Sequence, residues 1–518
     1  MNLAMAASPA AIRAALGSPA GRRLREEMGS WVIGFLPAEQ VVPEVYAAWR
    51  PLVRDAMLFM ITHLSADRLA PKLVEQLELP PGTTPEARLL RLIAKVPALQ
   101  KIGQVLARNR HFHPALRHAL SELENGISDV TPAEIRAVIE HQFGPRIERY
   151  GVEIEPDIFS EASVSAVMRF TWRNPQSGDR ERGVFKVMKP YVPACFAEDL
   201  ELLQQLASHL AAIHPEYGRA LPETITETRR LLEHEVDFSR EQNILAEAAR
   251  AYRQVRGVRV PRLIRRLSTA TITAMSEEEG VKVTALAGAE ASERRQAAQQ
   301  VIQALVAVPL LATGRTAIFH ADPHAGNMLY NERTGELVLL DWALTERLTA
   351  EQRRRTAVMA VLLGLRDPVG VAAEIEALTL EGAALDPEQR RFIHGEVDRF
   401  IGQLPFSRLP GSLEAMRLLD RLALHGVRFP SGLMMFRKVL FTMDGILHDL
   451  AAPNVHIDWV IARQLAGRWL GNLTSFGSPL SVFDWIGVQS SALLYGARLW
   501  VQWAQAALDR GTWSAADH

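Results

Sequence analysis

The sequence predicts an α+β protein in which a small sheet-bearing lobe precedes a larger helical lobe, with a helical extension in front of both. Long stretches of the chain carry apolar residues at intervals of three and four, which is typical of amphipathic helices. The middle of the chain contains short runs rich in Val, Phe and Met around polar turns, which is typical of β-hairpins. We therefore expect a sheet layer packed with helices.

Residues 1–149 are expected to form the helical extension. The segments EVYAAWRPLVRDAMLFMITHL and PEARLLRLIAKVPALQKIGQVLARN have the apolar spacing of helices, and PPGTTP marks the break between them. No run in this part alternates as a strand does. The extension is therefore predicted to be all-helical.

Residues 150–282 are expected to form the sheet-bearing lobe. The runs VSAVMRFTW and GVFKVMK flank the polar stretch NPQSGDRER and predict a hairpin. Two helical segments follow, at 194–213 and 222–254, before strand-like runs at VRVPRLIRRL and TATITAM. This alternation of short strands and longer helices favours a small lobe built on one sheet.

Residues 283–518 are expected to be helical apart from one hairpin. The uncharged run at 296–314 has the length of a membrane span, but its four glutamines and Pro309 favour a buried helix. The segment at 480–508 is apolar and rich in Trp, and is interrupted by Asp484 and Arg498. It fits either a packed pair of helices or a segment that lies on a membrane surface without crossing it.

Composition limits the class of protein. A chain of 518 residues that is 48% hydrophobic is long enough to bury a large core. Its net charge of −1 argues against a protein that coats nucleic acid, so no nucleic-acid partner is expected. The single cysteine, Cys195, excludes an intramolecular disulfide and fits a reducing compartment. The N-terminus has no basic segment before an apolar core, so we expect no secretory signal and a cytoplasmic location.

The stretches FHADPHAGNMLY (319–330) and LVLLDWAL (337–344) carry the pattern of a phosphoryl-transfer centre. Asn327 lies five residues after Asp322, and Asp341 follows fourteen residues later. Protein kinases place a catalytic Asp and a metal-binding Asn at this spacing on one loop, and a second metal-binding Asp after a short hairpin. NMLY and ELVLL around Asn331–Gly335 predict that hairpin. The pattern indicates catalysis by Asp322, Mg²⁺ bound by Asn327 and Asp341, and ATP as the phosphoryl donor.

A candidate phosphate-binding lysine precedes this centre. Lys186, in GVFKVMKP, lies 136 residues before Asp322 on a predicted strand, the place and order of the kinase lysine that contacts the α- and β-phosphates. Glu241 is expected to be its acidic partner on a helix that also carries Asp237 one turn earlier. The alternatives are a surface lysine on an edge strand and a solvated acidic helix face. Replacing Lys189, three residues further on and on the opposite strand face, is expected to leave nucleotide selectivity and basal turnover unchanged.

Histidines flank the catalytic aspartate. His320 and His324 titrate near neutral pH and are candidate acid/base groups, but phosphoryl transfer depends mainly on positioning and charge. We therefore favour a role for both in orienting the loop through backbone hydrogen bonds. His111 and His113 lack a third ligand at metal spacing and are expected to be structural.

Four blocks together resemble the UbiB/AarF family of atypical kinase-like proteins, which includes ubiquinone-biosynthesis accessory factors. KIGQ (101–104) is similar to the family's K-x-G-Q, EVD (235–237) to its E-x-D, FHADPHAGN to its catalytic loop and LLDWA to its metal-binding block. The match runs from about residue 99 to residue 348. It implies a protein-kinase-like bilobal fold, with the sheet-bearing N-lobe at 150–282 and the helical C-lobe at 283–518.

The resemblance also implies roles for individual residues. In the family, the N-terminal extension covers the place where a protein kinase accepts its peptide, and its K-x-G-Q lysine pairs with the E-x-D glutamate. Carried over, Lys101 would meet Glu235, with Gln104 and Asp237 in the same gating group. Ser163 falls in the stretch equivalent to the family's alanine-rich nucleotide loop and is expected to contact ATP.

Two positions depart from the family pattern. Glu161 stands in the nucleotide loop, where a carboxylate aimed at phosphates would repel them, so we expect either that Glu161 points outward or that nucleotide binding is weakened. Asp341-Trp342-Ala343 replaces D-F-G, and Ala lacks the backbone freedom of Gly, so a flip of this segment should be harder.

Two hypotheses for function follow. The first is an ATP- and Mg²⁺-dependent atypical kinase or ATPase that supports isoprenoid-quinone or other lipid metabolism at a membrane. The second is a pseudokinase that acts as a nucleotide-gated lipid-binding or scaffold module. The resemblance implies a lipid or quinone-precursor ligand, quinone-biosynthesis enzymes as partners, and a peripheral place on the cytoplasmic face of the inner membrane. Phosphorylation of peptides is disfavoured because the KIGQ extension would occupy the peptide site.

Overall fold

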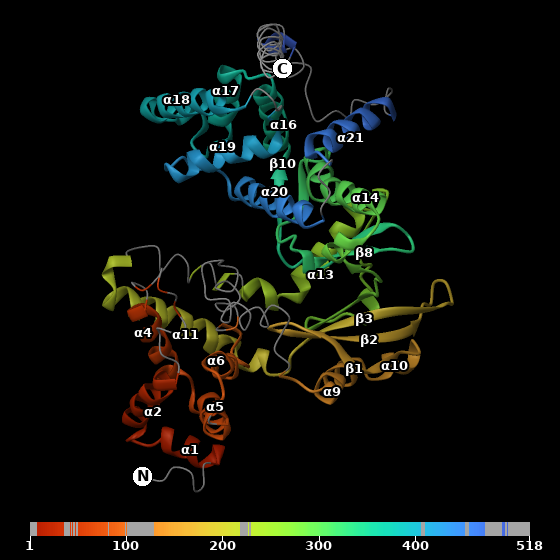
Figure 1. The fold of residues 1–518 in the computed structure, drawn as a ribbon. Coiled ribbons are helices and arrows are strands. Elements are labelled where there is room, and N and C mark those ends of the chain that lie inside the picture. Colours follow the sequence, from red (N-terminus) through yellow and green to blue (C-terminus); the bar gives the residue numbers. More distant parts are fainter. Residues whose placement is uncertain are drawn as a thin grey trace, which may run out of the picture. The chain divides into compact units, whose positions relative to one another are not determined.

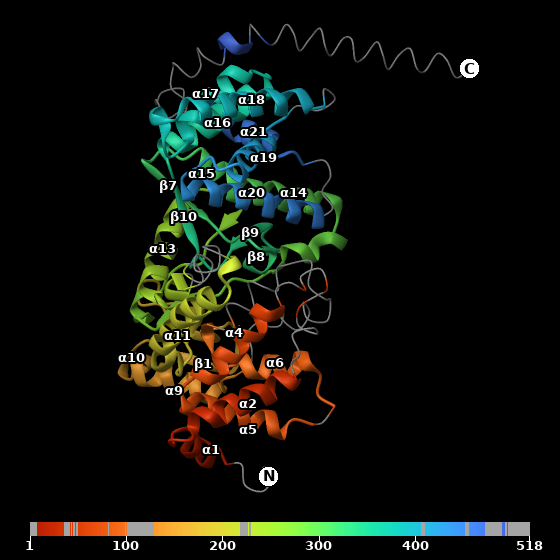
Figure 2. The same ribbon diagram turned by 90° about the vertical axis from the view of Figure 1, so that its left-hand side faces the viewer.

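The computed structural model describes residues 8–35, 42, 44, 47, 50–80, 82–98, 100, 129–217, 226, 229–230, 232–405, 410–450, 455–471, 489–492 and 495. The chain forms two compact units, Met1–Gln242 with Leu263–Glu277, and Asn243–Arg262 with Glu278–His518. Figures 1 and 2 show their helices and strands in two views. The kinase-like α+β class predicted from the sequence is confirmed, and the three-part division of the chain stays a prediction.

The first unit begins with helices, as the apolar spacing predicts. Ser8, Thr84 and Thr131 cap the first turns of three of them by accepting backbone N–H bonds. No strand occurs among the described residues before residue 150. The helices of this unit are α1 (Pro9–Leu16), α2 (Gly21–Phe35), α4 (Arg50–His63), α5 (Ala66–Glu78), α6 (Pro85–Ile93), α9 (Pro132–Phe143), α10 (Pro145–Arg149) and α11 (Val192–Ile213).

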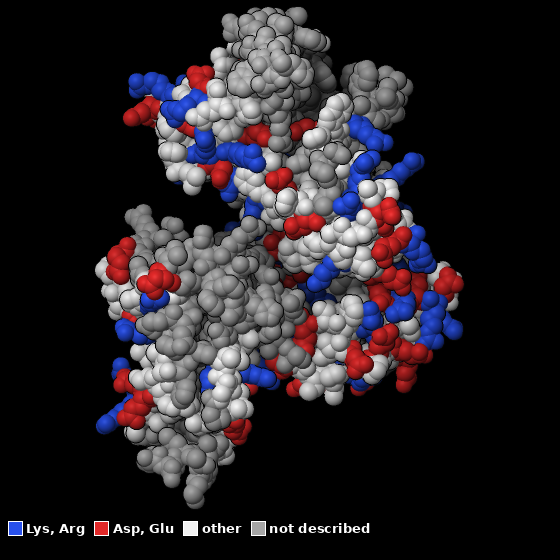
Figure 3. Space-filling model, in the orientation of Figure 1, with Lys and Arg blue, Asp and Glu red and all other residues white. Residues whose placement is uncertain are grey.

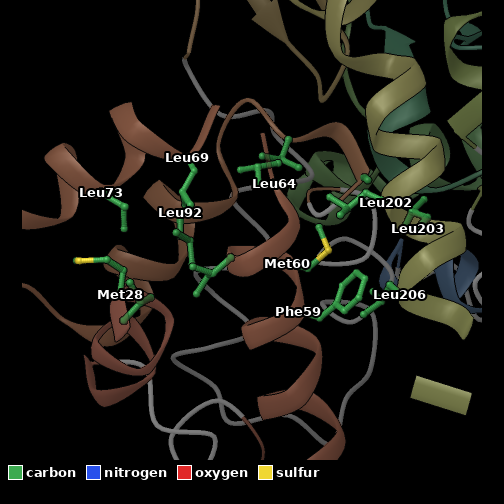
Figure 4. Close-up of a cluster of buried hydrophobic side chains, with 14 of the residues drawn as sticks. Met28, Phe59, Met60, Leu64, Leu69, Leu73, Leu92, Leu202, Leu203 and Leu206 are labelled. Atoms are coloured by element: carbon green, nitrogen blue, oxygen red, sulfur yellow. The ribbon is translucent and has the colours of Figure 1, made fainter. Parts of the chain in front are cut away.

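The N-terminal helices share a hydrophobic core with α11. Phe59 and Met60 of α4 lie beside Leu202 and Leu206 of α11 (Figure 4). Leu69 and other side chains of α5 and α6 continue the same cluster. Helix α11 thereby joins the extension to the sheet-bearing part of this unit, because it follows directly from the last strand of the predicted hairpin.

The sheet of the first unit is antiparallel, in the order β1-β2-β3-β5. The predicted hairpin is present, and the predicted strand at TATITAM pairs with its second strand. The edge strand β1 was not expected from the sequence. The strands are β1 (Glu153–Glu161), β2 (Ser165–Arg173), β3 (Arg180–Met188) and β5 (Ile272–Ser276). The alternating apolar side chains of β2 and β3 pack against α9 in a second core.

The predicted continuous helix at 222–254 is interrupted. Residues 232–236 are helical, the chain leaves the helix at Asp237, and α13 (Phe238–Ala251) begins there. Asp237 caps the new helix, since its Oδ1 accepts a hydrogen bond from Arg240 N at 2.9 Å. Asp237 and Glu241 therefore do not share a face of one uninterrupted helix, which corrects the expectation.

The second unit contains two small sheets that the sequence indicated only in part. The predicted hairpin after the catalytic loop is present, and it is flanked by a parallel and an antiparallel neighbour in the order β4-β9-β8-β6. A further antiparallel pair, β7 with β10, was not expected. The strands are β4 (Val258–Arg259), β6 (Val281–Lys282), β7 (Thr316–His320), β8 (Met328–Asn331), β9 (Glu336–Leu339) and β10 (Thr345–Thr349).

Helices make up most of the remainder of the second unit. The uncharged run at 296–314 is helical as far as Leu310 and buried over most of that length, as predicted, and it contains one π turn (Gln303–Ala307). In the part of the chain that the structure describes, no helix is both long and apolar enough to cross a membrane. The helices are α14 (Ala291–Ile302), α15 (Val308–Leu310), α16 (Ala350–Gly364), α17 (Pro368–Leu378), α18 (Pro387–Gln403), α19 (Ser412–Leu424), α20 (Ser431–Asp449) and α21 (Ile457–Gly471).

Several predictions fall on residues that the structure does not describe. These are the gating residues Lys101 and Gln104, the pair His111 and His113, and most of the segment at 480–508. On the described surface, basic and acidic side chains are interspersed (Figure 3), in keeping with the near-zero net charge.

Candidate functional site

The first unit brings Lys186 and Glu241 together. Lys186 lies on β3, where it pairs with Val167 of β2 on one side and Thr273 of β5 on the other. It therefore lies on an inner strand of the sheet and not on an edge strand. Its Nζ donates to Glu241 Oε1 at 2.7 Å, with the two side chains only 14% and 5% exposed. A surface lysine would not be shielded in this way. This lysine is thus held in one place by a carboxylate 55 residues away in the sequence.

The start of α13 positions Glu241. Asp237 caps the helix on one side of it. On the other side, Gln242 donates through Nε2 to Thr269 O at 2.8 Å and to Thr273 Oγ1 at 3.1 Å, which fastens the first turn of α13 to β5. Phe238 lies beneath the Lys186 ammonium, with 5.6 Å between the nitrogen and the ring centroid. The ion pair therefore rests on a helix that is fixed at both sides.

Two predicted residues of different roles meet at the end of the nucleotide loop. The Ser163 hydroxyl donates to Glu235 Oε2 at 3.2 Å, and Ser163 is buried. The expected nucleotide contact and the expected gating glutamate are therefore hydrogen-bonded to each other. The proposed Lys101–Glu235 pair involves a residue outside the described part of the chain.

The structure contradicts the outward-pointing alternative for Glu161 and places Lys189 beside it. The Lys189 side chain is fully buried, and its Nζ lies 3.0 Å from Glu161 Oε2 and 2.7 Å from Asp129 Oδ1. Glu161 thus neither points outward nor carries an uncompensated charge. Tyr191 adds a hydrogen bond to Asp129, and burial together with that carboxylate raises the pKa of its phenol. Lys189 is therefore a buried cation that joins the carboxylates of Asp129 and Glu161.

In the second unit, the pairing of β7 with β10 holds both ends of the catalytic segment that lies between them. His320, the last residue of β7, is paired with Thr345, the first residue of β10, and Ala321 N donates to Leu344 O at 3.1 Å. The intervening residues form a closed loop that contains the β8–β9 hairpin. Asp322 and Asn327 are tied together within it, since Asn327 Nδ2 donates to Asp322 O at 3.2 Å. This bond uses the amide nitrogen and leaves the amide oxygen for another ligand.

Asp341 stands in an unusual backbone conformation. Its φ is +47°, and its Oδ1 accepts a hydrogen bond from Ala343 N at 3.2 Å. The next residue, Trp342, is buried, packs on Tyr252 and His320, and donates to Leu339 O. The buried indole anchors the segment, while Asp341 is exposed.

The two histidines are joined to the backbone of the loop. His320 Nε2 lies 2.9 Å from Leu340 O, and its Nδ1 accepts a hydrogen bond from Asp322 N. Burial lowers the pKa of His320, so the imidazole is neutral near pH 7. His324 Nδ1 accepts a hydrogen bond from Gly326 N at 3.1 Å. These hydrogen bonds agree with the expectation that both histidines orient the catalytic loop through its backbone.

One cation near Asp322 was not predicted. Lys438, on α20, places its Nζ 3.8 Å from Asp322 Oδ1. It lies 116 residues further along the chain in a helix whose spacing indicates only core packing, so no local signal distinguishes it. The positive charge compensates the carboxylate on the catalytic loop.

The oxygen ligands of the second unit fit Mg²⁺. Mg²⁺ is usually held by one or two protein oxygens together with substrate phosphates and water, and Asp341 and Asn327 offer a carboxylate and an amide oxygen. No group of three or more His, Cys, Asp or Glu side chains suited to a metal occurs among the described residues.

Comparison with known proteins places these features in a family. Residues 122–374 match the model of the ABC1 atypical kinase-like domain. An uncharacterized protein of Synechocystis is 24% identical over 77% of this chain and 67% of its own length. Proteins named probable protein kinase UbiB are 24% identical in Pasteurella multocida, over 72% of each chain, and 22% identical in Glaesserella parasuis, over 73% of this chain and 69% of that protein.

A solved structure is also similar. A Mycobacterium tuberculosis protein in complex with erythromycin has a TM-score of 0.44 and 16% identity, over 68% of this chain and 87% of that chain. The family model and the UbiB-named relatives agree with the resemblance seen in the sequence blocks. Residues 122–374 thus match an ABC1 atypical kinase-like domain, and the resemblance to the UbiB/ABC1 family of atypical kinase-like proteins is confirmed.

Proposed function

We propose that this protein binds ATP with Mg²⁺ and acts as an atypical kinase or ATPase. The observation that carries the proposal is the shielded Lys186–Glu241 ion pair, at 2.7 Å, in a unit whose sheet and helix hold both partners rigidly. A lysine fixed by a glutamate in this way is the arrangement that kinases use to contact the α- and β-phosphates. Asp322, Asn327 and Asp341 supply the remaining residue types at kinase spacing.

Each of these residues has a defined task in the proposed reaction. Lys186 would neutralise charge on the α- and β-phosphates, and Asn327 and Asp341 would hold the metal through oxygen. Mg²⁺ supplies charge neutralisation on the β- and γ-phosphates. Asp322 accepts the proton of the attacking hydroxyl. A new bond forms between that oxygen and the γ-phosphorus, the bond from phosphorus to the β–γ bridging oxygen breaks, and ADP leaves.

The proposed acceptor is water or a hydroxyl of a lipid or quinone precursor. The resemblance to the UbiB/AarF family, which includes ubiquinone-biosynthesis accessory factors, supports a role near isoprenoid-quinone metabolism, carried out with other enzymes of that metabolism at a membrane surface. The test is Mg²⁺-ATP hydrolysis by the purified chain, with and without liposomes and a quinone-precursor analogue. Hydrolysis that requires Asp322 and rises with the added lipid supports the proposal.

One observation favours the second function, a nucleotide-gated binding module. Asp341 is tied to Ala343 N, and Ala343 lacks the freedom of the usual Gly, so the metal-binding segment is held in one state. Mg²⁺-ATP binding without turnover, accompanied by a change in lipid binding, would support this module over an enzyme. Absence of Mg²⁺-ATP binding would overturn both.

A further inference from the structure

The second unit contains a cavity of about 970 Å³ that none of the proposed catalytic, nucleotide-binding or gating residues lines. It lies between α14 with its π turn and α21, two elements that contact each other and lie side by side in Figure 1. A volume of this size falls in the range of small-molecule sites. The lining residues are Arg256, Gly257, Gln296, Gln299, Gln300, Gln303, Val455, His456, Trp459, Val460, Ala462, Arg463 and Gln464.

Glutamine amides form one wall of the cavity. Gln296, Gln299, Gln300 and Gln303 follow one face of α14 into the π turn, at helical spacing. Gln300 is only 7% exposed, and its Oε1 has no hydrogen-bond partner in the structure. That oxygen is itself enclosed, so the amide edge of the wall, not this atom, faces the cavity. The π turn adjoins this wall, and such turns occur frequently at functional sites.

The charge of the cavity is positive. No lining residue is acidic, and within the described part of the chain Arg256 and Arg463 form no ion pair. An arginine fork matches the oxygens of a phosphate group, and primary amides add further donors. Trp459, with 75% of its surface exposed, offers an apolar face at the same cavity. Cations, amide donors and one aromatic ring thus converge without a competing carboxylate.

We propose that this cavity binds a phosphate-bearing small molecule, held by Arg256 and Arg463, with its apolar or planar part against Trp459. The phosphate belongs either to a soluble phosphate ester or to the headgroup of a phospholipid. The volume accommodates more than a bare phosphate ion, and the glutamine wall suits the hydroxyl or carbonyl groups of such a molecule.

The wall of the cavity is joined to the catalytic hairpin. Gln296 and Gln300 donate through Nε2 to Gly335 O, in the β8–β9 turn, at 3.0 and 2.7 Å. Gly257 permits this approach, because a Cβ there would lie 2.4 Å from Gln300 Nε2. The hairpin connects Asn327 to Asp341 along the chain. A ligand that packs on Gln296 or Gln300 therefore contacts the same side chains that hold the turn.

The test measures binding directly and does not depend on ATP turnover. Calorimetry on the full chain uses two probes, glycerol 3-phosphate and phosphatidylcholine vesicles that contain phosphatidylglycerol. The variants are Arg256→Ala/Arg463→Ala and Gln303→Glu, the second of which places a negative charge in the cavity without changing side-chain volume. Arg315→Ala/Arg333→Ala is the control, since it removes two exposed charges of the same unit outside the cavity.

The expected result is that both cavity variants weaken one of the probes by about tenfold or more, while the control retains its affinity. Loss confined to glycerol 3-phosphate identifies a soluble ligand, and loss confined to the vesicles identifies a lipid headgroup. Binding of both probes that is unchanged in the cavity variants, or lowered equally in the control, overturns the proposal. Because ATP hydrolysis is not the readout, this result is separable from failure of the proposed function.

Discussion

The Lys189 ammonium and the Glu161 carboxylate lie 3.0 Å apart, with side chains 0% and 8% exposed. Asp129 completes the cluster from the segment that follows the K-x-G-Q region. Three segments distant in the sequence are thereby fixed at one buried charge, at the end of the predicted nucleotide loop. Removing that charge should affect the stability of the first unit before it affects chemistry.

We expect Lys189→Ala to lower the free energy of unfolding by roughly 3–5 kcal/mol, because two buried carboxylates lose their cation. Denaturant titration of the purified protein measures this. Lys282→Ala, at an exposed lysine, is the control and should change the value by less than about 0.5 kcal/mol. Equal small losses for both variants would show that the cluster contributes little.

We expect Asp341→Asn to abolish stabilisation by Mg²⁺-ATP while the fold is retained, because an amide cannot offset the charge of the metal as a carboxylate does. Thermal unfolding with ATP, in Mg²⁺ and in EDTA, measures the effect. Survival of the Mg²⁺-dependent shift in the variant would remove Asp341 from the metal site.

Lys186→Ala should weaken ATP binding by removing the cation opposite the phosphates, and Glu241→Ala should weaken it less, by freeing the lysine from its position. Because the two side chains are in contact, the losses should not add in the double variant. Binding of a fluorescent ATP analogue to the four proteins completes the cycle. Strict additivity would contradict a functional pair.

His320 should make stability depend on pH. Burial lowers its folded-state pKa below the ordinary value near 6.5, so the unfolded chain binds more protons in this range. Stability is therefore full above the ordinary value and is lost as the pH falls through it. Unfolding midpoints between about pH 5 and pH 8 should show this slope, and His320→Gln should reduce it. The control His324→Gln, at a largely exposed imidazole, should keep the slope of the wild type.

The hairpins and the catalytic segment were predictable because their signals are local. Strands β2 and β3 alternate apolar and polar residues, and β8 and β9 flank a four-residue stretch that contains Gly335, where φ is +65°. The kinase-like residue types around Asp322 also stand at a fixed spacing in a single stretch of the sequence. In such cases the local sequence is enough to predict the structure, because no contact with a distant segment is needed.

The features that sequence reasoning missed depend on distant partners. Strand β1 contains Pro156 and mostly exposed residues, and its pairing with β2 is irregular, so its alternation is hidden, as is common at a sheet edge. Strands β7 and β10 pair across the whole catalytic segment. Lys189 is buried only because carboxylates from residues 129 and 161 reach it. Local patterns contain no record of such contacts.

The positive φ of Asp341 restricts which residues this position tolerates. Most L-residues pay roughly 1–2 kcal/mol in the left-handed region, whereas Asp and Asn enter it more readily. Replacement of Asp341 by Glu would keep the negative charge, but Glu disfavours a positive φ. Replacement by Gly would allow the positive φ but would remove the charge. Asn is therefore the one replacement that alters charge while leaving the conformational preference nearly unchanged. The backbone geometry and the proposed metal contact therefore favour Asp at this position for independent reasons.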